Sequence, residues 1–260
     1  MNGKTNYNKQ GTNNMEIMKH YHEIDKLNIQ LSNGAIPKDY ELLYIDRLYC
    51  GLEAVEQNDI TRISPESPII PIEVIETTYA AALVAKVNQM ISNENPLNLR
   101  CTPEDKKKMY LESIEDSHEP DKYPDLLIHM GDLPEQGIQE VVCEIKRFTM
   151  LSAKNMVVDL NKLITYSSSQ IWNGHGYRFS VFIVTNTSQK ELEKKVRRFW
   201  NYSCSVKNLL KNNNKRELAF GKYVTENMEK LKNIICFCHH KEGEIDMCTV
   251  FDLVRNKIGK

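Results

Sequence analysis

The stretch "KYPDLLIHMGDLPEQGIQEVVCEIKRF", residues 122–148, decides the fold that we expect for this chain. Two largely apolar runs, "DLLIHM" and "IQEVVCEIKRF", are separated by "GDLPEQG", which is dense in glycine, proline and aspartate. Two strand-like runs with turn residues between them predict an antiparallel hairpin. Because side chains alternate along a strand, the apolar side chains of Val141, Cys143 and Ile145 share one face of the second strand.

The opposite face of this hairpin gathers charged side chains. Glu144 and Lys146 lie on it, and Asp125, at the start of the first strand, can lie near the end of the second. Two close carboxylates repel each other, and a divalent cation relieves that repulsion. Hard oxygen ligands suit Mg²⁺ or Mn²⁺. A lysine beside such a metal can orient a water molecule and offset the charge that builds up on a phosphate.

The pattern Pro124-Asp125 … Glu144-Ile145-Lys146 resembles the motif of the PD-(D/E)xK nuclease superfamily, the restriction-endonuclease-like proteins. In that superfamily a helix with an acidic residue precedes the hairpin, and a helix and then a strand follow it. We expect the same order over roughly residues 70 to 187. The resemblance implies an α/β fold with a central mixed β-sheet that is flanked by α-helices.

The resemblance also implies roles for the residues of the motif. Asp125 and Glu144 would hold one or two Mg²⁺ ions, or Mn²⁺, and the backbone carbonyl of Ile145 would be a further ligand. Lys146 would position the attacking water. The site would hydrolyse phosphodiester bonds in DNA.

Two further positions are suggested by the flanking helices. A helix is expected over residues 72–91, and its Glu73 fits the superfamily's upstream acid better than Glu76, although the sequence leaves both open. On the helix after the hairpin, Lys162 lies four residues before Tyr166. Some members of the superfamily have glutamine at the first of these positions, where this chain has lysine, which leaves the role of Lys162 open. By the resemblance we place Lys162 among the residues expected to bind the nucleic acid.

A basic segment follows the last strand of this unit. Residues 190–216 contain nine basic and two acidic residues, with aromatic residues among them. Such a run is usually a solvated helix face. Its basic side chains could also contact phosphates and give sequence-independent affinity for DNA. The residues that we expect to make these contacts are Lys194, Lys195, Arg197 and Arg198.

The composition agrees with an intracellular α/β protein. The chain has 260 residues, 41% of them hydrophobic, which suffices for one sizeable core. Its 34 basic and 35 acidic residues give no overall attraction to DNA or to membranes. No run of 18 apolar residues occurs, and the polar start lacks a signal peptide, so we expect no membrane association and a cytoplasmic location. The seven cysteines are expected to be reduced.

Three regions are expected along the chain. Residues 1–14 form a disordered arm, residues 15–68 add helices beginning with one over 14–31, and residues 69–260 form the nuclease-like domain with a C-terminal hairpin. One short strand is expected around residues 109–114. In the C-terminal hairpin, the cysteines either pack in the sheet core, which we favour, or join the neighbouring histidines in a zinc site: Cys236, Cys238, His239 and His240.

The sequence therefore predicts a Mg²⁺-dependent deoxyribonuclease, in host defence or a mobile element by resemblance only. One alternative is a nuclease fold that serves as a silent binding or assembly module. Another is an interaction protein that zinc stabilises. Whether the chain acts alone, as a homodimer or in a larger complex is left open.

Overall fold

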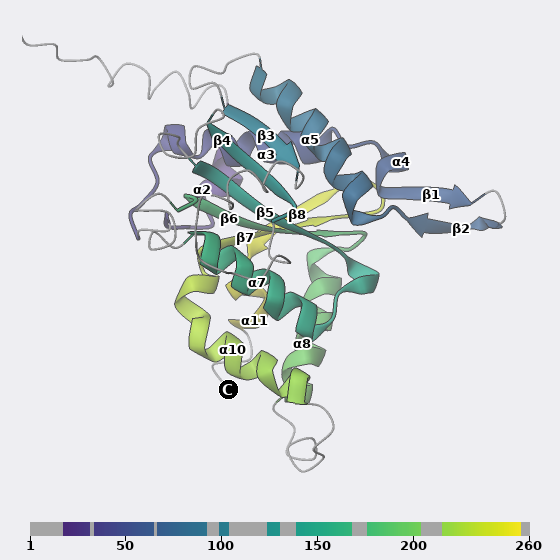
Figure 1. Cartoon of the computed structure of the whole chain (residues 1–260), viewed down its shortest axis with the longest axis vertical. Coiled ribbons are helices and arrows are strands. Elements are labelled where there is room, and N and C mark those ends of the chain that lie inside the picture. Colours follow the sequence, from purple (N-terminus) through teal and green to yellow (C-terminus); the bar gives the residue numbers. More distant parts are fainter. Residues whose placement is uncertain are drawn as a thin grey trace, which may run out of the picture.

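A six-stranded mixed sheet forms the centre of the protein (Figure 1). The computed structural model describes residues 18–31, 34–64, 67–92, 99–103, 124–130, 139–167, 176–203 and 215–255. The sheet order is β3-β4-β5-β6-β7-β8, in which β5, β6 and β7 are parallel and the outer pairs are antiparallel. The strands are β3 (Leu99–Pro103), β4 (Leu126–Met130), β5 (Gln139–Arg147), β6 (Phe179–Thr185), β7 (Ile234–His239) and β8 (Ile245–Thr249).

Helices cover both faces of this sheet, so the protein is α/β as expected. One face packs against a group of N-terminal helices: α2 (Tyr21–Asp25), α3 (Leu43–Glu53) and α5 (Glu76–Ser92), with the short α4 (Gln57–Ile60) and the 3₁₀ turn η2 (Asp39–Glu41) beside them. The other face packs against α7 (Ala153–Ser167), α8 (Gln189–Ser203), α10 (Lys215–Leu231) and α11 (Val250–Arg255). Each face therefore has a hydrophobic core of its own.

The predicted hairpin is confirmed by β4 and β5, which pair antiparallel. Val141, Cys143 and Ile145 are fully buried in the core with α3 and α5, whereas Val142 is buried in the core with α7. A strand with both faces covered reads as an almost continuous apolar run. Glu144 interrupts that run at a fully buried position, which singles it out for a role other than packing.

The helix that was expected over residues 72–91 begins later, at Glu76. The residues before it form strand β2 (Ser67–Glu73), which pairs antiparallel with β1 (Thr61–Ser64) in a separate two-stranded ribbon. In Figure 1 this ribbon extends away from the main sheet. Both prolines of "SPIIPIE" precede residue 72 and are compatible with a helix that starts there, so the pairing with β1, which the isoleucines favour, decides the strand.

The N-terminal half departs from expectation in other places as well. Residues 14–17 of the helix predicted over residues 14–31 lie outside the described residues, and within residues 18–31 the helix is limited to α2. Asn28, three residues after the end of α2, has a positive φ of 49°, which does not continue a helix. Strand β3 was not predicted, and the strand predicted at residues 109–114 lies outside the described residues. The predicted boundary between residues 68 and 69 falls within β2.

The C-terminal hairpin is confirmed by β7 and β8, with Gly243 in the turn at φ 92°. Cys236 and Cys238 are buried in the core with α8 and α11, as favoured from the sequence. His239 points to the other face, where its Nδ1 lies 2.7 Å from the hydroxyl oxygen of Tyr79 on α5. The four candidate zinc ligands therefore do not converge.

No helix in the described part of the chain is both long enough and apolar enough to span a membrane.

Candidate active site

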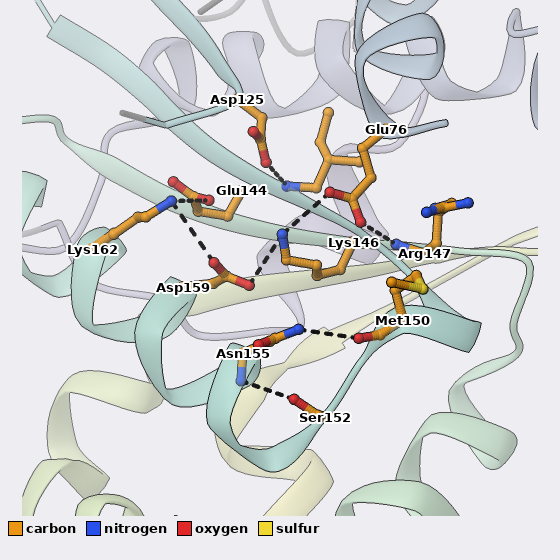
Figure 2. Close-up of polar contacts among 11 residues, drawn as sticks. Glu76, Asp125, Glu144, Lys146, Arg147, Met150, Ser152, Asn155, Asp159 and Lys162 are labelled. Carbon is orange, nitrogen blue, oxygen red and sulfur yellow. Dashed lines mark hydrogen bonds and ion pairs between the residues drawn. The ribbon is translucent and has the colours of Figure 1, made fainter. Parts of the chain in front are cut away.

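The site begins where the first strand of the hairpin meets the second. The backbone N–H of Asp125 donates to the carbonyl of Cys143 at 2.9 Å, which extends the β4–β5 ladder by one residue. The side chain then turns toward β5, where its Oδ2 accepts the backbone N–H of Ile145 at 2.7 Å (Figure 2). Asp125 is thereby held beside Glu144, as the sequence predicts.

Glu144 lies at the centre of the site with its side chain fully buried. Its Oε2 accepts a hydrogen bond from Lys162 Nζ at 3.2 Å. Its Oε1 is buried and has no hydrogen-bond partner among the described residues. Burial raises the pKa of Glu144 well above its usual value, the charge of Asp125 raises it further, and Lys162 opposes both effects.

Lys146 is two residues further along β5, on the same face as Glu144. Its Nζ donates to Glu76 Oε2 at 3.3 Å and lies 3.6 Å from Asp159 Oδ2. Burial lowers the pKa of Lys146, but the carboxylates of Asp159 and Glu76 outweigh burial and leave the pKa above its usual value. Lys146 is therefore an ammonium at neutral pH, which donates hydrogen bonds and cannot accept a proton.

The acid that the preceding helix brings to the hairpin is Glu76, the first residue of α5. Oε2 of Glu76 contacts Lys146, and its Oε1 accepts a hydrogen bond from the backbone N–H of Arg147 at 3.2 Å. Glu73, which the sequence favours, lies instead at the end of β2, opposite Thr61 of β1. The prediction that Glu73 lies on the helix is therefore wrong, and the structure joins Glu76 to the site.

Asp159 on α7 is a member of the site that sequence reasoning missed. Its side chain is buried, and its Oδ1 lies 3.9 Å from Lys162 Nζ. Burial raises the pKa of Asp159 to about 6, while Lys146 and Lys162 hold it lower than burial alone would. The signal was present in the sequence, because Asp159 falls within the apolar stripe of the helix, between Met156 and Leu160.

The predicted DNA-contacting residues divide into two groups. Lys162 lies within the site, whereas the others lie on α8. Lys194, Arg197 and Arg198 are exposed there. Lys195 instead donates from Nζ to the carbonyl of Phe148 and lies 4.3 Å from the centroid of its ring. It ties α8 to the 3₁₀ turn η4 (Phe148–Met150), which directly follows the strand that carries Lys146.

A second group of potential metal ligands lies on the N-terminal helices. One ligand atom each of His20, Cys50 and Glu53 lies within 4.8 Å of the other two. Glu53 Oε2 already accepts hydrogen bonds from Lys19 Nζ at 2.6 Å and from His20 Nε2 at 3.1 Å. The carboxylate is thus compensated by side chains of the protein itself.

The negative charge of the site around Glu144 is compensated less completely by the lysines of the protein. Its contacts form a row of alternating charges: Glu76, Lys146, Asp159, Lys162 and Glu144, with Asp125 beside the last. When all are ionised, these four carboxylates and two ammonium groups (−4 + 2) leave a charge of −2. A single divalent cation would balance that charge. No protein-family model, curated protein or solved structure matches the chain.

Proposed function

We propose that this chain is a metal-dependent nuclease of the PD-(D/E)xK type, which hydrolyses phosphodiester bonds in DNA with Mg²⁺ or Mn²⁺. The single observation that carries the proposal is the carboxylate of Glu144. It is fully buried, it lies beside Asp125, and its Oε1 lacks a hydrogen-bond partner in the described part of the chain. A buried carboxylate oxygen without a partner is costly unless a ligand completes its environment.

The donor set fits a hard divalent cation. Asp125 and Glu144 offer carboxylate oxygens, and the carbonyl of Ile145 between Glu144 and Lys146 offers a neutral one. No soft sulfur ligand takes part in the contacts described above, which favours Mg²⁺ or Mn²⁺ over zinc. When bound there, such an ion would lower the pKa of a water molecule and offset negative charge on the phosphate.

The remaining side chains would orient the reactants. Lys146 is an ammonium that can donate to the attacking water or to a phosphate oxygen, and Glu76 and Asp159 fix its position from two sides. Glu76 also holds the backbone of Arg147, so α5 and the end of β5 are locked together. The chemistry therefore depends on three elements: α5, the hairpin and α7.

The order of elements supports a restriction-endonuclease-like fold. Helix α5, the hairpin β4–β5, helix α7 and strand β6 occur along the chain in the order that the superfamily resemblance implies, with the additional strand β3 between α5 and the hairpin. Strands β5 and β6 are parallel, and α7 packs against both of them. This arrangement places Lys162 and Asp159 over the face of the sheet that carries Glu144.

DNA as the substrate is supported by the exposed basic residues of α8. Lys194, Arg197 and Arg198 lie on one helix, and this helix is joined by Lys195 to the turn that follows β5. Contacts from these side chains to phosphates would hold DNA without regard to its sequence.

A second candidate function follows from the ion pair between Lys162 and Glu144. If Lys162 neutralises Glu144 permanently, no metal binds, and the fold serves as a silent binding or assembly module. The two candidates differ in one property, which is cleavage that depends on a divalent ion.

The test is incubation of supercoiled plasmid and of single-stranded DNA with Mg²⁺, Mn²⁺ or EDTA. We expect cleavage with either metal, none with EDTA, and loss of cleavage in Asp125→Asn. The matched control is Asp25→Asn, which removes an exposed carboxylate from α2 and should cleave like the wild type. A protein that binds DNA but does not cleave it with Mg²⁺, with Mn²⁺ or with EDTA would favour the silent module.

A further inference from the structure

Lys162 lies between two carboxylates that come from different elements. Its Nζ is 3.2 Å from Glu144 Oε2 on β5 and 3.9 Å from Asp159 Oδ1, one turn earlier on its own helix. All three side chains are largely buried, with exposed fractions of 13% for Lys162, 0% for Glu144 and 4% for Asp159. Lys162 thus pairs closely with Glu144 and only loosely with Asp159.

The pairing with Glu144 conflicts with metal binding at the same carboxylate. An ammonium a few ångströms from a divalent cation in a partly buried site would repel it electrostatically and weaken its binding. The ion therefore gains affinity if Lys162 moves away from Glu144. The flexible four-carbon stem of lysine permits such a movement without any change in the helix.

Asp159 offers a second carboxylate to the displaced ammonium. Its Oδ2 is buried without a hydrogen-bond partner among the described residues, and it lies 3.6 Å from Lys146 Nζ, beyond hydrogen-bond distance. Asp159 therefore has unused capacity to accept hydrogen bonds. The Nζ of Lys162 lies 3.9 Å from the other oxygen of this carboxylate, Oδ1, so a small movement of the ammonium would bring it to hydrogen-bond distance of Asp159.

We propose that Asp159 is a positioning residue that takes over Lys162 when a divalent cation binds at Asp125 and Glu144. Lys162 is then a displaceable counter-ion: it neutralises Glu144 before the metal arrives and Asp159 afterwards. Asp159 acts on the metal through Lys162. This inference rests on the proposed function in one respect only, which is that the ion binds at Asp125 and Glu144.

The test is the affinity for Mn²⁺ without DNA, measured by electron paramagnetic resonance of the free ion at fixed pH and ionic strength. Lys162→Met removes the competing charge, so we expect about tenfold tighter binding, the order of effect for one charge near a partly buried ion. Asp159→Asn removes the acceptor and leaves Lys162 on Glu144, so we expect about tenfold weaker binding. Lys162→Arg retains a counter-ion and should stay within about threefold of the wild type.

The double variant Asp159→Asn/Lys162→Met separates this proposal from a direct electrostatic effect of Asp159. If Asp159 acts through Lys162, the double variant should bind Mn²⁺ nearly as tightly as Lys162→Met does. An equal loss of affinity from Asp159→Asn in both backgrounds would overturn the proposal, as would a Lys162→Met protein that binds no tighter than the wild type. Lys162→Gln gives a second version of the cycle if Lys162→Met does not fold.

Asp125→Asn shows which claim has failed. If this variant binds Mn²⁺ as tightly as the wild type, the ion is not at Asp125 and Glu144, and the metal site of the proposed function is itself wrong. If Asp125→Asn no longer binds Mn²⁺, but Lys162→Met and Asp159→Asn do not change the Mn²⁺ affinity in opposite directions, only the proposed displacement of Lys162 is wrong.

Discussion

Single side chains in the site depend on one another because each lysine serves two carboxylates. Lys146 lies between Glu76 and Asp159, and Lys162 lies between Asp159 and Glu144. Removing one partner of a buried pair leaves the other charge uncompensated, which usually costs more than the pair contributed. Substitutions that preserve shape, such as carboxylate to amide, are therefore the informative ones here.

The structure distinguishes Glu76, which contacts Lys146, from Glu73, whereas the sequence left open which of the two is the upstream acid. Glu76→Gln should slow cleavage about tenfold or more, because Lys146 loses one of the two charges that orient it, and small misplacements of a catalytic group are costly. Glu73→Gln, on β2, should cleave within about twofold of the wild type, since substitutions outside a site usually have small effects. Single-turnover rates with Mg²⁺ measure both. The reverse order of the two rates would restore Glu73 as the upstream acid.

The elements of the fold were predictable where a local pattern decided them. The alternation around Glu144 and the turn residues before it were enough to predict the hairpin. The start of α5 was misjudged because "IEVIE" has helical spacing. Its first two residues, Ile72 and Glu73, instead pair with β1, and that pairing depends on a strand elsewhere in the chain. The burial of Asp159 could have been predicted from its place in the apolar stripe of α7, but its contact with Lys146 depends on how α7 packs against β5, which no local pattern shows.

At the scale of a single element, the exposed basic residues of α8 can be tested for DNA binding. Neutralising Lys194, Arg197 and Arg198 to Gln should weaken DNA binding and flatten the plot of log K against log salt by up to about 0.9 for each phosphate that the helix no longer binds. The matched control neutralises three exposed lysines outside α8, which are Lys26, Lys222 and Lys241. Fluorescence anisotropy over a salt series compares the two. Equal slopes for both triple variants would show that α8 is an ordinary solvated helix.

At the scale of the whole molecule, a buried acid outside the candidate site links stability to pH. Glu140 at the start of β5 is 1% exposed, its Oε1 lies 3.7 Å from Arg178, and its Oε2 has no hydrogen-bond partner among the described residues. Burial raises the pKa of Glu140 to about 7; Arg178 opposes this effect and Glu41 adds to it. The folded protein therefore holds this proton more tightly than the unfolded chain does.

Global stability should depend on pH accordingly. As pH rises from about 4.5 to 7, the unfolded chain releases the Glu140 proton first, so the free energy of unfolding falls and then levels off. The Glu140→Gln protein has no such proton to release, so its free energy of unfolding should not fall in this way. Its free energy of unfolding should exceed that of the wild type by near zero at pH 4.5 and by about 3 kcal/mol above pH 7. Urea unfolding of both proteins at pH 5, 6, 7 and 8 measures the difference. An advantage that is constant with pH would contradict the assignment.

The central claim is that a divalent ion held by Asp125 and Glu144 lets this protein hydrolyse DNA. The most direct measurement is single-turnover cleavage of plasmid DNA in Mg²⁺ and in EDTA by the wild type and by Glu144→Gln, which keeps the shape of the buried side chain. We predict cleavage by the wild type only with Mg²⁺, and a rate for Glu144→Gln that is lower by about a hundredfold or more. A folded Glu144→Gln protein that cleaves at the wild-type rate, or a wild type equally active in EDTA, would contradict the account.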